Sequence, residues 1–367
     1  MGDSLKKGNE LKRHVSVIIP IYNAGDKLKN CICSILRQSF SDFTLILVDD
    51  GSTDKSGEIC DEFAERDNRV YVIHQINKGS VEARKIGIFS EAAQKSEYLM
   101  LCDADDTIPK NALKILVESA KKYEADCVCG NMRRMVGNVL IPKCLVKFIP
   151  QCFQTGKVQA YSHDAIMKDL YISCFGISNY PVTLWGKLYK RELLTSAAKM
   201  EPIVRFMGED LSMTLRIMPN IDKLIIIPDV VYYYRIGGET SKFMPYMLDD
   251  FLALYHYKDQ FRQQYEMDSS VKTLMEIELL NITCSYLQMC KYPGKFSKSE
   301  MNQEILKVIS IPEIEAAAIS LQRKKEEHIW VPWILNKNVE AIEDSINQWY
   351  KRTGFKRIIM FIFNGIS

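Results

Sequence analysis

The stretch Leu99-Met100-Leu101-Cys102-Asp103-Ala104-Asp105-Asp106 decides how the rest of the chain is interpreted, because three carboxylates directly follow an apolar run. The apolar run predicts a buried strand, and acids clustered at its end repel one another unless a cation or hydrogen-bond donors lie beside them. Mg²⁺ and Mn²⁺ are cations that prefer carboxylate and phosphate oxygens. The other interpretation is that Asp106 caps a helix, since an apolar-periodic segment follows. Both interpretations are compatible, because three acids exceed what one cap needs.

Strand-like and helix-like segments alternate around this stretch. Predicted strands cover residues 15–20, 43–48, 69–74 and 98–102, and predicted helices cover 28–38, 56–66 and 81–93. Such alternation with short connections predicts an α/β fold with a doubly wound, mostly parallel sheet flanked by helices. Ligands of such sheets bind at the carboxyl ends of the strands. Four polar loops lie at those ends, at residues 22–23, 49–52, 77–80 and 103–106.

The pattern changes at about residue 125. Patterns are mixed over 126–245, where we predict helices over 164–171 and 208–218 and a loop and strand over 184–194. The pattern is almost entirely helical over 246–367, with predicted helices over 248–264, 271–290, 299–309, 312–325 and 338–350. We therefore expect a flexible N-terminus over 1–13, a ligand-binding half over 14–125, a second half of the same domain over 126–245, and a C-terminal helical extension.

Composition excludes several classes of protein. The chain has 367 residues, 47% hydrophobic and 26% charged, and its formal net charge of +2 gives no electrostatic reason to expect nucleic-acid binding. Its 11 cysteines include no C-x-x-C pair, and residues 1–9 lack an apolar signal core, so we expect reduced thiols and a cytoplasmic protein. No apolar run approaches the roughly 20 residues that span a bilayer.

Several interpretations remain open for the C-terminal region. The basic segment 351–357 precedes the apolar segment 358–363, which suits peripheral contact with an anionic surface such as the inner face of the cell membrane. A terminal helix or strand docked on the core explains the same pattern. The helices before it are expected to bind a lipid-linked ligand, to form a homo-oligomer, or to complete the core.

Five short motifs occur in the same order as in a known family. They are Val17-Ile18-Ile19-Pro20-Ile21-Tyr22-Asn23, Val48-Asp49-Asp50-Gly51-Ser52-Thr53-Asp54, Asn77-Lys78-Gly79, Ala83-Arg84 and Asp103-Ala104-Asp105-Asp106. With these motifs, residues 14–240 resemble the family 2 glycosyltransferases of GT-A fold, including those of bacterial surface-polysaccharide assembly. The resemblance implies inverting transfer of a sugar from a nucleotide-sugar, expected to be UDP-linked, with Mn²⁺ or Mg²⁺. It also implies that 14–125 bind this donor and that 126–245 bind the acceptor, a saccharide or lipid-linked saccharide.

The resemblance assigns most of the motif residues to the donor. Tyr22 would stack on the nucleobase, and Asp49 would accept a hydrogen bond from the uracil N–H. Arg84 would reach the base or a phosphate. Asp103 would lie near the ribose, and Asp105 would bind the metal, with Asp103 as a second metal ligand. The complete donor set is Pro20, Tyr22, Asn23, Asp49, Arg84, Asp103, Asp105 and Arg235. Taken singly, Tyr22 is also explained as a half-buried loop residue and Arg84 as a solvated helix residue.

Gly208-Glu209-Asp210 resembles the acidic motif of the same family that supplies a general base. This makes Asp210 the group that deprotonates the acceptor hydroxyl, with Glu209 as the second candidate. Two acids at the start of a helix are also explained by their interaction with the helix dipole. Trp185 and Lys187 match a further family motif and are expected near the acceptor, although core packing explains Trp185 equally well.

Two other functions compete with this interpretation. A sugar nucleotidyltransferase shares the doubly wound sheet and carboxylate-bound Mg²⁺. It needs a glycine-rich, basic loop after the first strand, and Tyr22-Asn23-Ala24-Gly25-Asp26 is neither. A non-catalytic scaffold with this fold is favoured by loss of Asp105 or Asp210, and both are present.

Overall fold

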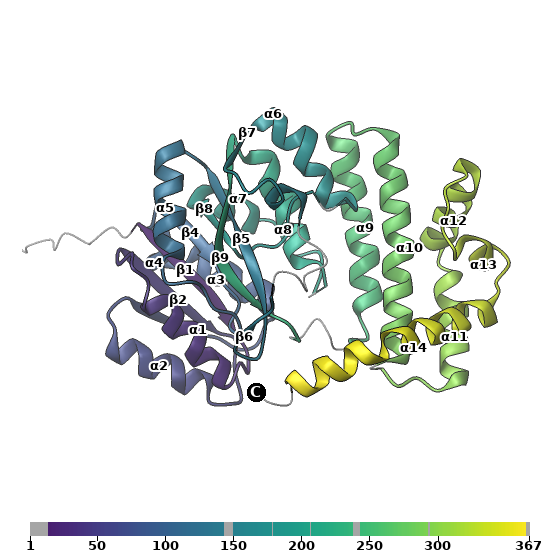
Figure 1. The fold of residues 1–367 in the computed structure, drawn as a ribbon, viewed down its shortest axis with the longest axis horizontal. Helices are drawn as coiled ribbons and strands as arrows, with labels where there is room; N and C mark the ends of the chain where they lie inside the picture. The colour runs from purple at the N-terminus through teal and green to yellow at the C-terminus, as the bar shows by residue number, and fades with distance from the viewer. Residues whose placement is uncertain are drawn as a thin grey trace, which may run out of the picture.

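In a computed structural model of the chain, one nine-stranded sheet lies beside an array of long helices (Figure 1). The structure describes residues 14–142, 150–177, 179–205, 207–237, 243–292 and 294–364, with side chains as far as residue 352. The expectations for residues 1–13 and for the side chains of 358–363 therefore lie outside the described residues.

The sheet has the strand order β3-β2-β1-β4-β8-β5-β9-β7, with β6 beside β5. Its strands are β1 (Val15–Ile21), β2 (Phe43–Asp49), β3 (Val70–His74), β4 (Tyr98–Leu101), β5 (Cys127–Val136), β6 (Val139–Leu140), β7 (Gln159–Ser162), β8 (Lys187–Lys190) and β9 (Lys223–Arg235). The first four strands are parallel, as predicted, while β8 is antiparallel to both β4 and β5. The carboxyl ends of β1, β2 and β4 thus share one edge with the loops that follow them.

Helices cover both faces of the sheet. Val17 and Ile19 pack with one set of helices and Ile18 packs with the other, because successive side chains of a strand point to opposite faces. The first set is α1 (Asp26–Leu36), α2 (Ser56–Arg66) and α5 (Ala112–Tyr123). The second set includes α3 (Ser80–Phe89), α4 (Glu91–Gln94), α7 (Arg191–Ala198) and α8 (Glu209–Ile217).

Local structure differs from the predictions in three places. The predicted helix 81–93 divides at Ser90, whose extended backbone places its hydroxyl to accept from Ala93 N at 3.3 Å and cap α4. Residues 191–198 form α7 rather than continuing a strand. The segment predicted as one helix over 164–171 is α6 (His163–Ala165), then a π-helical turn Ile166–Leu170 and a 3₁₀ turn Tyr171–Phe175.

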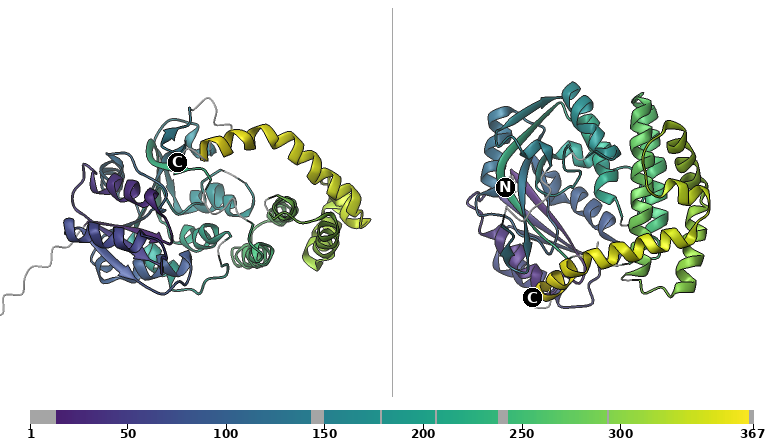
Figure 2. Two further views of the ribbon diagram at one scale, coloured as in Figure 1. Left: turned by 90° about the horizontal axis from the view of Figure 1, so that it is seen from below. Right: turned by 45° about the vertical axis from the view of Figure 1, so that its right-hand side comes forward.

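The C-terminal region is helical, as predicted, and has its own core. It contains α9 (Met247–Gln264), α10 (Ser269–Lys291), α11 (Lys298–Ile309), α12 (Pro312–Lys324), the unpredicted α13 (Val331–Leu335) and α14 (Val339–Asn364). α14 runs from this array back toward the sheet (Figure 2). Within the described residues, no helix is both apolar enough and long enough to traverse a bilayer.

Candidate active site

The loop after β4 presents two of its three acids to solvent and buries the third. Asp103 and Asp105 are half-buried, whereas Asp106 is buried and its Oδ1 accepts a hydrogen bond from Arg235 N at 2.6 Å. Burial and the charges of Asp103 and Asp105 raise the pKa of Asp106 to about 8. Asp106 does not cap α5, which begins at Ala112, so the predicted cap is wrong. Asp106 instead ties the loop to the end of β9.

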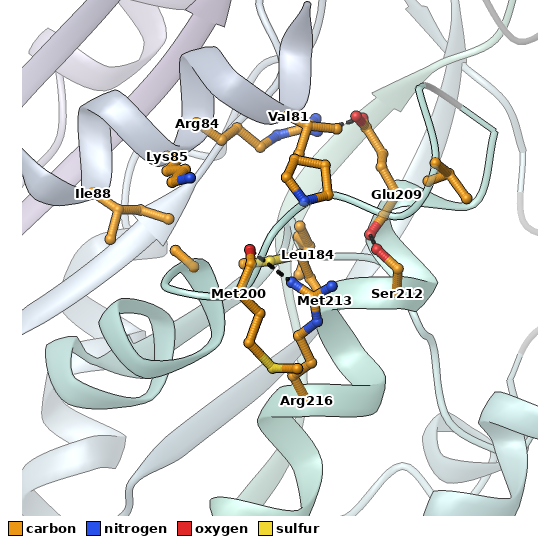
Figure 3. Close-up of a pocket in the computed structure, with 13 residues that line it drawn as sticks. Val81, Arg84, Lys85, Ile88, Leu184, Met200, Glu209, Ser212, Met213 and Arg216 are labelled. Carbon is orange, nitrogen blue, oxygen red and sulfur yellow. Dashed lines mark hydrogen bonds and ion pairs between the residues drawn. The ribbon is translucent and has the colours of Figure 1, made fainter. Parts of the chain in front are cut away.

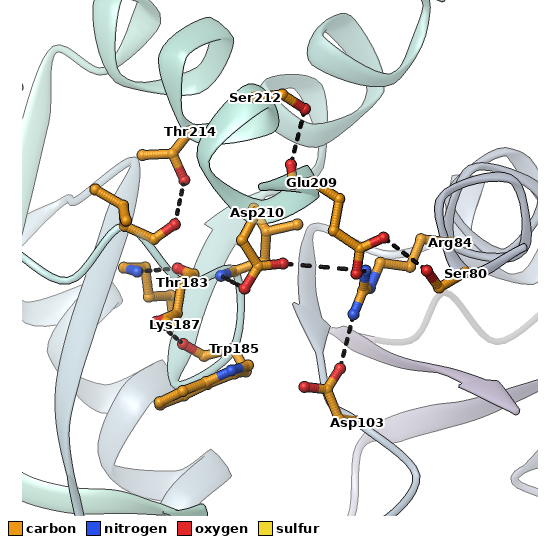
Figure 4. Close-up of polar contacts among 12 residues, drawn as sticks. Ser80, Arg84, Asp103, Thr183, Trp185, Lys187, Glu209, Asp210, Ser212 and Thr214 are labelled. Atoms are coloured by element: carbon orange, nitrogen blue, oxygen red, sulfur yellow. Dashed lines mark hydrogen bonds and ion pairs between the residues drawn. The ribbon is translucent and has the colours of Figure 1, made fainter. Parts of the chain in front are cut away.

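Arg84 joins this loop to the acidic motif of α8 (Figure 4). Its Nη2 lies 2.8 Å from Asp103 Oδ1, and its Nη1 donates to Glu209 Oε1. Ser80 Oγ donates to the other Glu209 oxygen at 2.6 Å. Burial lowers the pKa of Arg84, but the surrounding carboxylates outweigh it and hold that pKa well above the usual value. Arg84 is therefore a buried, charged link rather than the solvated helix residue that was the alternative.

Asp210 lies beside this link. Its Oδ2 accepts a hydrogen bond from Leu184 N at 3.3 Å, and its Oδ1 lies 4.0 Å from Arg84 Nη1 without a hydrogen-bond partner among the described residues. Burial raises the pKa of Asp210 to about 7; Arg84 opposes this shift and Glu209 adds to it. A carboxyl group with a pKa near neutrality is well matched to accepting a proton from a hydroxyl group.

A mostly apolar pocket adjoins Arg84 and Glu209 (Figure 3). Val81 and Ile88 of α3, Leu184, and Met213 of α8 lie around it. Arg84, Lys85 and Arg216 also line this pocket, so its wall combines apolar side chains with three cationic ones.

Asp49 is held by a histidine that the sequence analysis did not single out. Asp49 Oδ2 lies 2.9 Å from His74 Nδ1, and Asp49 Oδ1 accepts from Ser52 N at 3.1 Å. His74 Nε2 lies 3.0 Å from Asp61 Oδ1, and hydrogen bonds to Asp49 and Asp61 raise the pKa of His74. The position of His74 at the end of β3 was the available signal, because strand ends meet at the ligand-binding edge.

Asn23 and Asp50 organise the neighbouring loops. Asn23 has φ 48°, and its Oδ1 accepts from Thr53 N at 2.8 Å and Asp54 N at 3.2 Å. The Asp50 carboxylate accepts from the backbone N–H groups of Lys78 and Gly79, both at 2.8 Å, immediately before α3. These bonds fix the donor-side edge, and a direct contact between Asn23 and a donor stays a prediction.

The other predicted donor residues differ in accessibility. Tyr22 is 52% exposed after β1, so its ring is available to stack on a base, while Pro20 is half-buried within β1. Arg235 is buried, and its Nε donates to Asp105 O at 2.7 Å while its Nη1 donates to Gly137 O. Arg235 therefore supports the acidic loop, and a direct contact between Arg235 and the donor stays a prediction.

Trp185 and Lys187 also have structural partners. The indole of Trp185 stacks on the rings of Tyr232 at 4.6 Å and Tyr234 at 5.3 Å, and Tyr232 Oη accepts from Asp103 N at 3.1 Å. Lys187 is buried, and its Nζ donates to Pro181 O at 2.8 Å and to Thr183 O. Lys187 thus holds the segment before Trp185, and an acceptor contact for either residue stays a prediction. The two tyrosines, two residues apart on one strand face, were the missed signal for this stack.

The acidic loop has the chemistry of a divalent-cation site completed by a substrate. No three metal-binding side chains gather anywhere in the part of the chain that the structure describes. Mg²⁺ sites commonly use only one or two carboxylates together with substrate phosphates, and Asp103 and Asp105 would be such a pair. Burial and the nearby charge of Asp103 raise the pKa of Asp105, which indicates negative charge that a cation would neutralise.

A mostly parallel sheet with flanking helices and acidic residues at its carboxyl edge defines the GT-A class of fold. Residues 16–141 match the model of the family described as glycosyl transferase family 2. Over these residues the chain is similar to glycosyltransferase family 2.

Known proteins are similar to this chain over stretches of different length. Glycosyltransferase GlyG of Streptococcus pneumoniae is 46% identical over 118 residues, which are 32% of this chain and 38% of GlyG. Glycosyltransferase GlyA of the same organism is 27% identical over 303 residues, 81% of this chain and 42% of GlyA. The chain thus spans about two fifths of the length of these relatives. The structure of S. aureus TarS 1–349 in complex with UDP-GlcNAc has the same fold, with a TM-score of 0.62 and 19% identity over 91% of this chain and 92% of that one.

Proposed function

We propose that the protein is an inverting, metal-dependent glycosyltransferase. It moves a sugar from a nucleotide-sugar, UDP-linked by analogy with the TarS complex, to a hydroxyl group of a saccharide or lipid-linked saccharide. The observation that carries the proposal is the Arg84 link, which brings the donor-side acid Asp103 and the acceptor-side acids Glu209 and Asp210 into one charged cluster. A scaffold without activity would have no need to bury an arginine among these acids.

Each side of the cluster has a separate task in this reaction. Asp210 takes the proton from the acceptor hydroxyl, whose oxygen attacks the anomeric carbon of the donor sugar. The bond from that carbon to the phosphate oxygen breaks, and its electron pair leaves with the nucleoside diphosphate. Because attack and departure occur on opposite faces, the anomeric configuration inverts.

Asp103 and Asp105 would hold a Mg²⁺ or Mn²⁺ ion, which when bound neutralises the charge of the leaving diphosphate. Tyr22 would stack on the base, and Asp49, fixed by His74, would accept its N–H. Arg84 holds Asp103 and Glu209 in place and keeps positive charge close to Asp210.

The proposal is tested by a thermal-shift panel of nucleotides and nucleotide-sugars, each with and without Mn²⁺. A ligand that binds only the folded state raises the melting temperature. A Mn²⁺-dependent shift with UDP and one UDP-sugar, followed by release of UDP when an acceptor is added, supports the proposal. A shift with nucleoside triphosphates alone points to a nucleotidyltransferase, and no shift with any nucleotide points to a scaffold.

The location and assembly of the protein belong to the same proposal. Peripheral contact with the cytoplasmic face of a membrane would place the enzyme beside a lipid-linked acceptor, and it rests on the basic and apolar composition of 351–363. Co-sedimentation with anionic vesicles tests this contact. Self-association stays a prediction, which the molar mass in solution would check.

A further inference from the structure

The loop that leads into Glu209 and Asp210 is held by the C-terminal helical region. Asp250, in the first turn of α9, is 3% exposed. Its Oδ1 accepts from Arg205 N and its Oδ2 from Met207 N, both at 2.9 Å. One buried carboxylate therefore fixes two backbone N–H groups just before Gly208 and the acidic motif.

A single face of α9 contacts successive residues of this loop. Tyr246, Asp250 and Leu254 are spaced by four residues and so lie on one helix face. The guanidinium of Arg205 lies 5.4 Å from the ring of Tyr246. At the other end, a Cβ added to Gly208 would lie 2.5 Å from Leu254 Cδ2, so the loop backbone comes against the helix.

The far end of α8 is tied to the same helix. Arg216 Nε donates to Tyr257 Oη at 2.7 Å, and both side chains are buried. The same guanidinium donates to the carbonyl of Glu201 at 2.9 Å. α9 thus contacts α8 at both ends: at the loop before its first turn and at Arg216 in its last turn. The two helices lie next to each other in Figure 1.

We propose that Asp250 is a positioning residue for the general base. By fixing the backbone of the loop, it determines where α8 begins and so where Asp210 lies relative to the donor. This inference rests on the proposed function, because it concerns the placement of the base. It also gives the C-terminal region a task beyond completing the fold.

Removing the carboxylate should displace the base without altering the donor side. An Asp250→Asn variant keeps the size of the side chain but directs an amide N–H₂ group at one of two backbone N–H donors, which then lacks an acceptor. Small misplacements of a catalytic group are costly, so we expect kcat to fall about 10- to 100-fold. The KM for the nucleotide-sugar should stay within about twofold, since the donor residues lie on other loops.

The experiment compares wild type, Asp250→Asn and the matched variant Asp249→Asn, whose aspartate is the exposed neighbour on the same helix. Steady-state kinetics give kcat and KM, and amide hydrogen exchange of the peptides covering 203–212 reports on the loop itself. We expect faster exchange and lower kcat in Asp250→Asn alone. If Asp250→Asn does not fold, Asp250→Glu, which keeps an acceptor on a longer stem, provides the same comparison.

An unchanged kcat, or unchanged exchange over 203–212, would overturn the inference. So would a loss of donor affinity equal to the loss of kcat, because that pattern indicates general loosening of the fold. If wild type transfers no sugar from any nucleotide-sugar, the proposed function fails. Hydrogen exchange then still shows whether Asp250 holds the loop.

Discussion

Arg84 and Glu209 are 125 residues apart in the sequence and form a largely buried ion pair in the structure. The same guanidinium reaches Asp103, so the acid that follows β4 and the acid that begins α8 share one cation. The pair therefore connects the two halves of the α/β domain at the place where donor and acceptor would meet.

Replacing Arg84 by Met should leave three acids without their cation. Removing one partner of a buried ion pair typically costs about 3–5 kcal/mol, so the free energy of unfolding should fall by about that amount, and transfer should be lost. Urea denaturation and a UDP-release assay measure the two effects. The matched variant Lys85→Met, at a neighbouring residue with looser ion pairs of 3.7 and 3.9 Å, should change stability by less than about 1 kcal/mol.

Replacing Asp210 by Asn should separate binding from transfer. The variant should bind UDP with Mn²⁺ as wild type does, while kcat falls about 10²- to 10⁴-fold through loss of the general base. Glu209→Gln keeps the base and weakens the Arg84 pair, so its loss should be smaller. A larger loss in Glu209→Gln than in Asp210→Asn would assign the base to Glu209.

The pH profile of kcat should report the pKa of Asp210, which burial raises from 3.8 to about 7. A base must be deprotonated, so the rate should fall as the pH drops below about 7, and Asp210→Asn should lack this acidic limb. Stability responds in the opposite direction. Because the folded-state pKa is the higher one, the contribution of Asp210 to stability is largest below about pH 4 and is lost as the pH rises through about 7.

Asp105→Ala should abolish the Mn²⁺-dependent part of the thermal shift with UDP. The metal-independent shift, which comes from contacts with the base, should remain. Wild-type protein treated with EDTA should behave like the variant. An undiminished Mn²⁺ response in Asp105→Ala would place the metal elsewhere.

Tyr22→Ala should weaken binding of UDP by about tenfold, because stacking of a base on an aromatic ring contributes about 1–3 kcal/mol. Isothermal titration measures the dissociation constant. Tyr71, a comparably exposed tyrosine on β3, provides the control, since Tyr71→Ala should leave UDP binding unchanged. Equal affinities for wild type and Tyr22→Ala would remove Tyr22 from the donor site.

Much of the fold was predictable because its signals are local. Alternating apolar strands and amphipathic helices over the first 125 residues predicted a parallel sheet, and the helical periods after residue 246 predicted α9 to α12 closely. The break at Ser90 and the short α7 were not predicted, since a capping hydroxyl and a strand of four residues give weak periodic signals.

The candidate site divides in the same way. Asp103, Asp105, Glu209 and Asp210 were singled out because acids cluster there in motifs that resemble those of a known family, and their roles stay predictions. The partners of two other carboxylates, Asp49 and Asp250, were not found, because their hydrogen bonds to His74 and Met207 join residues far apart in the chain. Nor did any local pattern predict that Asn23 and Lys187 would form hydrogen bonds with the backbone of neighbouring loops.

The sequence by itself determined the class of fold and predicted the edge of the sheet where the candidate site lies, since strand periodicity and motif order can be read from short stretches of the chain. Only the tertiary structure decided that Arg84 is shared by Asp103 and Glu209, that Asp106 supports β9, and that α9 holds the loop before the base. These depend on which segments the packed core brings within hydrogen-bonding distance, and that outcome is set by burial of the whole chain rather than by any one stretch of it.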